Sequence, residues 1–405
     1  MTRTPSLFEN ERLTLERAIA LTRESLETYG QQYRHWAIAY SGGKDSSTVV
    51  TLVAALLERR AIPQPESLTV LYADTRMELP PLQMAALQIL AEVSRRGIAT
   101  QVVLPPLDDR YMVYLFGRGV PPPKNRAFRW CTPQLKVEPM ERALRVLREQ
   151  SGEKLLLLTG VRVGESAARD QRIALSCSRD GGECGQGWFQ EQTKSALADV
   201  LAPCLHFRVC HVWDWLTFHA PAAGFSTALI AEVYGGDEKE EINARTGCVG
   251  CNLASKDLAL STLLKQEQWR YLAPLTRLRP LYQELIRPQY RLRKDGTDRR
   301  KDGSLAANPM RLGPLTMEAR RYGLSQVLDI QEQVNRAARA ALRPCIDLIN
   351  AEEQARILEL IEANTWPEKW TGREARGDVL LSQVLAEGVL QPLLLEPLQM
   401  GGEDV

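Results

Sequence analysis

The sequence predicts an α/β fold, a doubly wound and mostly parallel sheet followed by a helical C-terminal region. Three observations lead to this prediction. Short apolar runs alternate with longer amphipathic segments through the first part of the chain. A glycine-rich turn joins the first apolar run to an apolar segment of helical length. Beyond residue 255 the pattern is dominated by long segments with helical periodicity.

Each predicted element has a local reason. Strands are expected where short apolar runs end at polar or glycine residues, and helices where apolar residues recur at helical spacing. The strands are predicted at residues 36–40, 67–73, 99–104 and 155–160. The helices are predicted at residues 11–29, 48–57, 81–95, 135–148, 258–285, 317–343 and 351–364. A soft boundary divides the chain into an α/β domain with a cysteine cluster at 1–255 and a mainly helical region at 256–405.

The totals set limits on function. The net charge of +1 over 405 residues predicts no overall attraction to nucleic acid, so any such binding depends on a local patch. The first residues lack the apolar core of a secretory signal, and no run has the length of a membrane span. We therefore expect a cytoplasmic protein without a membrane partner. In a reducing compartment, the eight cysteines indicate metal binding or catalysis rather than a disulfide framework.

The central motif is the sequence SGGKDSS at residues 41–47. A strand, a glycine pair and a helix N-terminus create an anion site, because free amides and the positive end of the helix dipole face one point. Hydroxyl groups and a lysine add further donors. The alternative is a tight turn with a solvated lysine. The predicted phosphate-binding residues are Ser41, Gly42, Gly43, Lys44, Asp45, Ser46 and Ser47.

Three further residues follow strands of the same sheet. Asp74 ends the second predicted strand, and Gly160 and Arg162 end the fourth. Ligands of such sheets bind at the carboxyl ends of the strands. We therefore expect Asp74 to hold the nucleoside, with Gly160 and Arg162 beside the phosphates.

The cysteines form a second constellation. Cys248 and Cys251 make a C-x-x-C turn, whose thiolates could bind zinc or an iron–sulfur cluster together with others. Cys131 opens a helix after Arg129, where the dipole and the cation favour a thiolate. A glycine-rich stretch holds two more candidates. These are Cys177 and Cys184. The apolar surroundings of the remaining three favour buried structural roles. These are Cys204, Cys210 and Cys345.

Two segments are rich in cations. Residues 107–130 form a long proline-rich connection that borders Cys131 and could hold an anionic substrate. Residues 287–301 are the most basic stretch and could follow a phosphate backbone. A solvated loop is an equal alternative for the second segment, because three aspartates dilute its charge.

The motif at 41–46 resembles the PP-loop of ATP pyrophosphatases, which implies an adenine nucleotide α-hydrolase-like fold, bound ATP and Mg²⁺. Further motifs resemble the phosphoadenosine phosphosulfate reductases: WCTPQLKVEP at 130–139, GVRVGES at 160–166, a stretch ending at Trp213, and GCVGC at 247–251. The reductases carry a catalytic Glu-Cys-Gly after the C-x-x-C, which is absent here. A single cysteine at 131 with a later C-x-x-C is more similar to the DNA phosphorothioation sulfurtransferases of the DndC and SspD type.

This resemblance implies an ATP-dependent sulfurtransferase. Such an enzyme adenylates an acceptor oxygen, expected to be a DNA backbone phosphate, and inserts sulfur with release of AMP and pyrophosphate. Lys44, Asp45, Arg162 and Cys131 would be catalytic. A [4Fe–4S] cluster would be held by Cys131, Cys248 and Cys251 with Cys184 as the fourth ligand, in preference to Cys177 or an open iron. A zinc site with the same ligands is the alternative.

The resemblance also implies partners. A cysteine desulfurase would donate the sulfur, and other phosphorothioation proteins would present the DNA. Three rival functions remain: a reductase acting on an adenylyl sulfate, a tRNA-thiolating enzyme, and a non-catalytic ATP-binding scaffold stabilised by zinc.

Overall fold

The computed structural model describes the chain as two compact units. The first contains the described residues within Met1–Asp74, Glu78–Leu104 and Lys136–Thr246, and the second those within Thr75–Met77, Pro105–Leu135 and Gly247–Val405. The described residues are 13–124, 128–164, 170–171, 173, 187–235, 248–254, 256–300, 302–379, 382–384 and 390–392. The division differs from the boundary expected at residue 255, because residues 105–135 are grouped with the C-terminal part. Two separate domains at 1–255 and 256–405 therefore stay a prediction.

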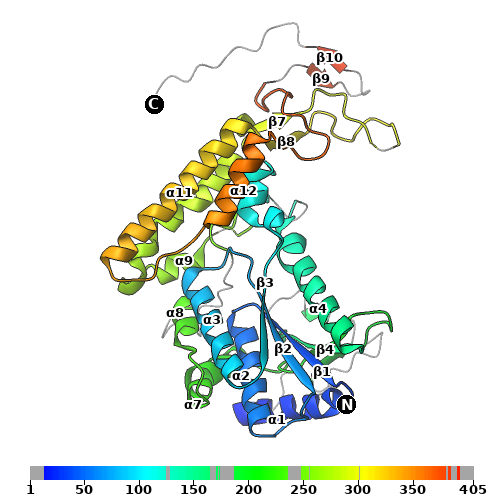
Figure 1. The fold of residues 1–405 in the computed structure, drawn as a ribbon, viewed down its shortest axis with the longest axis vertical. Coiled ribbons are helices and arrows are strands. Elements are labelled where there is room, and N and C mark those ends of the chain that lie inside the picture. The colour runs from blue at the N-terminus through cyan, green and yellow to red at the C-terminus, as the bar shows by residue number, and fades with distance from the viewer. Residues whose placement is uncertain are drawn as a thin grey trace, which may run out of the picture. The chain divides into compact units, whose positions relative to one another are not determined.

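The first unit is built on a six-stranded sheet with the order β3-β2-β1-β4-β6-β5. Figure 1 labels β1, β2, β3 and β4 of this sheet. Every neighbouring pair is parallel except β5 and β6, which are antiparallel. The predicted α/β fold with a mostly parallel sheet is therefore confirmed. The strands are β1 (His35–Tyr40), β2 (Ser67–Ala73), β3 (Ala99–Val103), β4 (Leu155–Leu158), β5 (Trp188–Gln190) and β6 (Ala198–Ala202). The last two were not predicted.

The helices of this unit begin and end at residues suited to those positions. The hydroxyl of Thr14 accepts a hydrogen bond from the Arg17 amide and so caps the first helix. Helix α4 (Glu138–Ser151) has Pro139 in its first turn and is followed by Gly152, whose φ of +71° is left-handed. The helices are α1 (Leu15–Ser25), α2 (Lys44–Glu58), α3 (Pro80–Arg95), α4 (Glu138–Ser151), α6 (Val209–Asp214), α7 (Ala220–Ala222) and α8 (Ala228–Val233).

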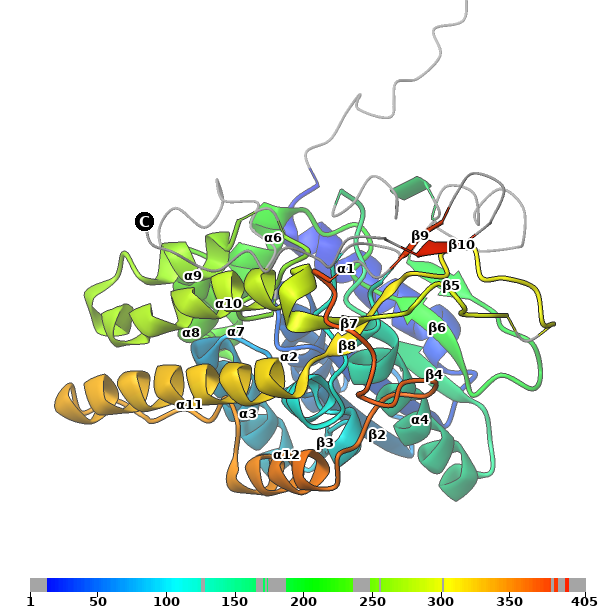
Figure 2. The same ribbon diagram turned by 90° about the horizontal axis from the view of Figure 1, so that it is seen from above.

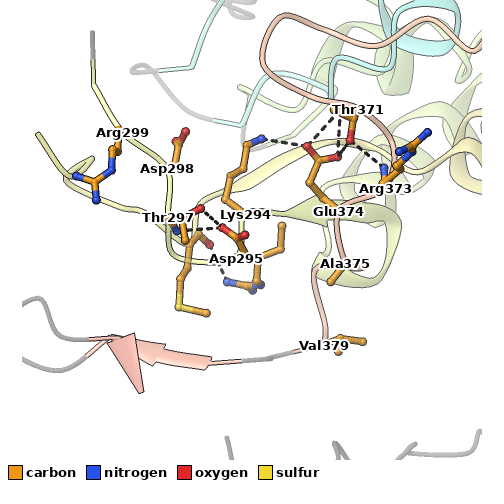
Figure 3. A pocket seen from close by; sticks show the side chains of 12 residues that line it. Lys294, Asp295, Thr297, Asp298, Arg299, Thr371, Arg373, Glu374, Ala375 and Val379 are labelled. Atoms are coloured by element: carbon orange, nitrogen blue, oxygen red, sulfur yellow. Dashed lines mark hydrogen bonds and ion pairs between the residues drawn. The ribbon is translucent and has the colours of Figure 1, made fainter. Parts of the chain in front are cut away.

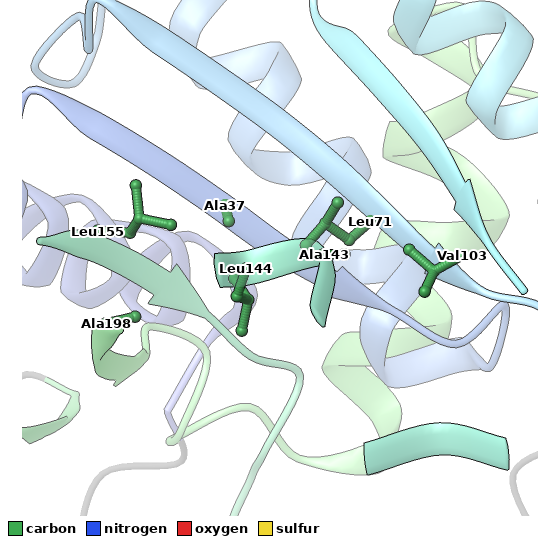
Figure 4. Packing of buried hydrophobic residues seen from close by; sticks show 7 residues of the cluster. All are labelled: Ala37, Leu71, Val103, Ala143, Leu144, Leu155 and Ala198. Carbon is green, nitrogen blue, oxygen red and sulfur yellow. The ribbon is translucent and has the colours of Figure 1, made fainter. Parts of the chain in front are cut away.

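Helices cover both faces of the sheet. Figure 4 shows the face beneath α4, where Ala143 and Leu144 pack on apolar residues from five strands. These are Ala37, Leu71, Val103, Leu155 and Ala198. On the opposite face, the hydroxyl of Ser47 in α2 donates to Tyr40 Oη over 3.3 Å. Alternate residues of β1 therefore point to opposite helices, as the period of a strand requires.

The second unit is largely helical. Figure 2 shows α10 lying along the longer α11. The predicted helix at 258–285 is divided into three pieces, and Pro274, which lacks an amide proton, lies in the middle one. A short antiparallel hairpin of β7 and β8 was not predicted. The elements are α9 (Leu258–Leu263), a 3₁₀ helix (Glu267–Arg277), α10 (Leu278–Leu285), β7 (Arg291–Arg293), β8 (Leu312–Leu315), α11 (Met317–Ala340), α12 (Ala351–Glu362), β9 (Ser382–Val384) and β10 (Leu390–Pro392).

The connection at 107–130 is held in the second unit by ion pairs to α12. Arg356 binds the carboxylate of Asp108 through two bonds of 2.6 and 2.8 Å. Arg110 lies 2.8 Å from Glu352 and 3.4 Å from Glu353. This connection was expected to be irregular, but it contains a 3₁₀ turn (Leu107–Asp109) and a π-helical turn (Val113–Gly117).

Two of the cysteines expected to be buried are not. Cys204 is buried, as predicted, with 4% of its surface exposed. Cys210 and Cys345 are exposed, because Cys210 lies on the outer side of the short helix α6 and Cys345 lies in the loop after α11. Among the described helices, none combines the length and apolar character needed to cross a bilayer.

Candidate functional site

The glycine-rich loop lies at the point where the strand order of the sheet reverses. β1 pairs with β2 on one side and with β4 on the other, so the chain leaves β1 in one direction and β4 in the opposite one. The loop at 41–43 follows β1, and Gly160 follows β4. Ligands of open parallel sheets bind at such a switch point. The topology therefore brings together two segments that the sequence assigned to the nucleotide.

The loop itself has the form of an anion cradle. Gly42 has a φ of +74°, and a Cβ there would lie 3.0 Å from the Cβ of Ala86. The hydroxyls of Ser41 and Ser46 lie 3.1 Å apart, and that of Ser46 donates to the Gly43 carbonyl. No described side chain caps the N-terminus of α2, which starts at Lys44. The first amides of α2 are thus available to an anionic ligand.

Three charged side chains are linked beside this cradle. The carboxylate of Asp45 lies 2.9 Å from Lys44 Nζ and 2.5 Å from Arg162 Nε, through different oxygens. Lys44 and Arg162 expose only 7% and 3% of their surfaces. Two cations share one carboxylate, so the group keeps a net positive charge. It is therefore suited to phosphate oxygens.

Gly160 allows the close approach of β4 to α2. A Cβ at this position would lie 2.8 Å from the backbone nitrogen of Ser46 and 2.9 Å from its Cα. Both atoms belong to backbone and cannot rotate away. Gly160 therefore sets the distance between the two segments of the switch point, a packing role that the sequence did not indicate.

Asp74 lies at the end of β2 with 6% of its surface exposed. Its backbone amide donates to the Val103 carbonyl over 3.1 Å, and its carboxylate accepts a hydrogen bond of 3.1 Å from Gln83 in α3. The residue is therefore fixed by two neighbouring elements. Its expected contact with a nucleoside stays a prediction.

Two tyrosines near the loop were not singled out from the sequence. Tyr72 packs under Gly42, and its hydroxyl is buried with no hydrogen-bond partner among the described residues. Burial raises the pKa of Tyr72, with the charges of Glu78 and Asp74 acting in the same direction. Tyr234 places its ring 5.1 Å from Lys44 Nζ. The alternation along β2 could have indicated Tyr72, whereas nothing local indicates Tyr234.

The C-x-x-C turn lies in the second unit and rests on the start of α10. The amide of Cys251 donates to the Cys248 carbonyl over 3.1 Å. Gly250 has a φ of +69°, and a Cβ there would lie 2.8 Å from the Cβ of Leu278. A glycine is required at this position on both grounds.

Cys131 lies in the same unit, and its electrostatics link it to the turn. Burial raises the pKa of Cys131, and the charge of Cys251 raises it further. Arg129 lowers this pKa, as predicted, but burial and Cys251 outweigh it. Burial likewise raises the pKa of Tyr111, and the charges of Cys131, Cys248 and Cys251 add to that effect. The charges of three of the four predicted cluster ligands thus act on one aromatic side chain, whose ring stacks on that of Trp130 with 5.3 Å between the ring centroids. That these thiols share one cluster stays a prediction.

The residues around these thiols suit a bound polar group. Both polar atoms of the Asn252 side chain, next to Cys251, are buried without a hydrogen-bond partner among the described residues. If the Asn252 amide donates to a thiolate or sulfide sulfur of a bound group, that sulfur is its partner. Within the described residues, no three Cys, His, Asp or Glu side chains are placed to hold a single metal ion. Cys177 and Cys184 lie outside the described residues.

Several cations expected to hold substrate have other partners. Arg110 binds Glu352 and Glu353, and Arg118 lies 3.4 Å from Asp109. These two arginines of the 107–130 connection are therefore engaged in folding contacts. Lys124 and Arg129 are exposed, and Arg126 lies outside the described residues.

Comparison with known proteins identifies a domain family over part of the chain. Residues 35–220 match the profile of the phosphoadenosine phosphosulfate reductase domain. The match supports a domain of this PP-loop type. It spans the loop, Asp74, Cys131 and Arg162, and it ends before the C-x-x-C turn. Among curated proteins none matches the sequence.

Two solved structures are similar to parts of the chain. One is a phosphoadenylyl-sulfate reductase from Candida auris in a phosphate complex, with 13% identity, a TM-score of 0.33, and 52% of this chain and 89% of that chain covered. The other is the U34-tRNA thiolase NcsA from Methanococcus maripaludis with its [4Fe-4S] cluster. It has 14% identity and a TM-score of 0.34, and the match covers 67% of this chain and 79% of that chain.

Proposed function

We propose that this protein is an ATP-dependent sulfurtransferase of the PP-loop type that modifies DNA. It adenylates a non-bridging oxygen of a backbone phosphate and replaces that oxygen with sulfur, releasing pyrophosphate and AMP. The observation that carries the proposal is the group of Lys44, Asp45 and Arg162 beside the loop at the switch point of the sheet. The family match over residues 35–220 supports a nucleotide-using enzyme of sulfur metabolism.

The first step follows from the charges of the loop. The amides at the start of α2, with the hydroxyls of Ser41 and Ser46, bind the β- and γ-phosphates, whose charge Mg²⁺ would balance. Ser47 was predicted to bind them too, but its amide donates to the Gly43 carbonyl and its hydroxyl to Tyr40. Lys44 and Arg162, both oriented by Asp45, face the negative charge that grows on the α-phosphate. The acceptor oxygen forms a bond to the α-phosphorus, and the bond from that phosphorus to the leaving pyrophosphate breaks.

The second step needs a sulfur nucleophile at the sulfide oxidation level. It attacks the phosphorus of the adenylated DNA, and AMP leaves with the former acceptor oxygen. Cys131, Cys248 and Cys251 would hold a [4Fe–4S] cluster, with Cys184 as the proposed fourth ligand. When bound, such a cluster would supply the sulfur. We propose a cysteine desulfurase as its source, with a thiol reductant that supplies the two electrons needed to convert the persulfide sulfur of the desulfurase to sulfide. We also propose other phosphorothioation proteins as partners on DNA.

A second candidate function is a reductase acting on an adenylyl sulfate, because the matched family is named for that chemistry. Its products would be sulfite and a nucleotide, and a thiol donor would be oxidised in the reaction. A zinc-stabilised scaffold that binds ATP without turnover is the non-catalytic alternative.

The experiment compares the three functions on protein purified without oxygen, with iron and sulfide measured beforehand. The proposal expects DNA-dependent release of pyrophosphate from ATP, which Lys44→Ala abolishes. Lys194→Ala, which removes an exposed lysine elsewhere, serves as the control. Sulfite release from adenylyl sulfate would favour the reductase. A colourless, zinc-containing protein that binds ATP without releasing pyrophosphate would favour the scaffold.

A further inference from the structure

A second polar cavity lies within the second unit, outside the residues assigned to ATP or sulfur. It has a volume of about 510 Å³ and is lined by β7, the turn that follows it and the segment 371–379. Cavities of this size commonly hold small molecules or parts of larger ones. Most of its lining is polar or charged, and Met310, Ala375 and Val379 are its apolar members. A charged ligand therefore suits it better than an apolar one.

The acidic side chains of the lining already have partners. Asp298 lies 2.7 Å from Arg311, and Glu374 lies 3.0 Å from Lys294. Asp295 accepts hydrogen bonds from the amide and hydroxyl of Thr297 (Figure 3). Two of the three carboxylates are thus paired with a cation, and the third is hydrogen-bonded to neutral groups. The four cations of the lining still outnumber its three acids.

Among the described residues, none of the three arginines of the lining forms an ion pair with a carboxylate. Arg293 is held by the carbonyls of Gly377 and Met310. Arg299 and Arg373 are exposed, and the one side-chain hydrogen bond of the pair within the described part of the chain is from Arg299 to the Gly303 carbonyl. Figure 3 shows them on opposite sides of the cavity. Two separated guanidinium groups suit a ligand with more than one anionic group, such as successive phosphates.

No aromatic side chain is among the described residues that line the cavity, and the neighbouring Trp370 is already covered. Lys294 lies 4.3 Å and Arg311 5.3 Å from the ring of Trp370, which exposes 9% of its surface. Its face is therefore not open to a stacked base. A nucleic acid would be held here by its backbone. Contacts of that kind carry no sequence information of their own.

We propose that this cavity binds the phosphate backbone of the DNA substrate through Arg299 and Arg373. The inference rests on the proposed function for the identity of the ligand. It adds to that function a site that holds the acceptor strand. Binding at this site contributes affinity for DNA without sequence preference.

The test measures the binding of a short fluorescein-labelled DNA duplex by fluorescence anisotropy, without ATP, at several salt concentrations. Arg299→Ala and Arg373→Ala should each weaken binding about fivefold or more and reduce the slope of log affinity against log salt by about 0.9. The double variant should lose more than either. Arg142→Ala removes an exposed arginine of α4 and should change neither quantity appreciably. Duplexes of different sequence should respond alike.

Several outcomes would overturn the proposal. One is wild-type DNA affinity in the double variant, with melting temperatures showing that it is folded. Another is tighter binding of an RNA of the same sequence. A third is that inorganic phosphate or a free nucleotide binds in an arginine-dependent way while DNA does not. ATP binding measured without DNA should be unchanged in the arginine variants, so a failure of the nucleotide site would be seen separately.

Discussion

The guanidinium of Arg162, just beyond the end of β4, lies 2.5 Å from the carboxylate of Asp45 in the first turn of α2. This contact joins the two segments of the switch point across the place where the phosphates are proposed to bind. The same carboxylate also holds Lys44. Asp45 is therefore better described as an orienting residue than as a group that reacts with ATP.

The first prediction concerns this contact. Arg162→Lys keeps the charge but loses the fixed geometry of the guanidinium, so pyrophosphate release should fall by about 100-fold or more. Asp45→Asn should have an effect of similar size, since both cations lose their shared partner. Steady-state assays of pyrophosphate release measure the effect. If Arg162→Lys turns over ATP at the wild-type rate, Arg162 does not stabilise the transferring phosphate.

The second prediction concerns the approach of β4 to α2. Gly160→Ala should destabilise the first unit by about 1–3 kcal/mol, because the new methyl group meets the backbone of Ser46. Gly43→Ala is the matched control, because a Cβ at Gly43 would lie 3.5 Å from the nearest atom, the Tyr234 hydroxyl oxygen, which is ordinary van der Waals contact. Thermal unfolding should therefore separate the two variants. Equal melting temperatures would show that β4 can move away from α2 without cost.

The third prediction is a pH dependence in the second unit. The hydrogen bond from Arg356 lowers the pKa of Asp108 below its ordinary value of 3.8, although burial opposes this. A carboxyl with a depressed folded-state pKa stabilises the protein above its unfolded-state pKa, and that contribution is lost as the pH falls through the folded-state value. Solvent screens the pair, since Asp108 exposes 42% of its side chain. We expect about 0.5–1 kcal/mol near neutral pH.

The measurement compares thermal unfolding of the wild type and Asp108→Asn from neutral pH into acid. The difference in stability should be constant down to about pH 4 and should shrink below it. Glu368→Gln, which removes an exposed carboxylate that forms no ion pair among the described residues, is the control. A difference that grows in acid would have the wrong sign for the proposed pair.

Local patterns predicted what local sequence determines. The strands at 67–73 and 99–104, the helix at 81–95 and the loop at 41–47 depend on runs of neighbouring residues, and the structure has elements there. The place of Arg162 beside Asp45 depends on β1 and β4 being neighbours in the sheet. An expected parallel sheet predicts that the ends of its strands lie at one edge. It does not predict that the Arg162 side chain contacts Asp45.

Contacts between distant segments explain what the sequence did not predict. Arg110 was expected to be free for an anionic substrate, but its partner Glu352 lies 242 residues further along the chain. Tyr234 reaches Lys44 from the end of α8. β7 and β8 are short and polar in part, and a long loop separates them, so no alternation marks a hairpin. Charge counts along the sequence cannot tell a compensated cation from a free one.

The last prediction concerns Asn252, whose buried amide has no partner among the described residues. Asn252→Leu should leave the metal-free protein as stable as the wild type or more so, because an unsatisfied polar group is replaced by an apolar one of similar size. The same change should weaken retention of iron, because a donor to sulfur is lost. Thermal unfolding and iron release to a chelator, both under anaerobic conditions, provide the two measurements.

Asn335 supplies the matched control for this prediction. Its side chain is also buried, but it donates to the Ile346 carbonyl over 2.9 Å and accepts from the Ile346 amide over 2.7 Å. Asn335→Leu should therefore lose about 1–3 kcal/mol of stability in the metal-free protein and leave iron retention unchanged once folded. If Asn252→Leu is destabilised to the same degree and retains iron like the wild type, its amide has a structural partner and does not face a bound sulfur. Opposite signs in the two variants would instead assign the Asn252 amide to the group that Cys131, Cys248 and Cys251 are proposed to hold.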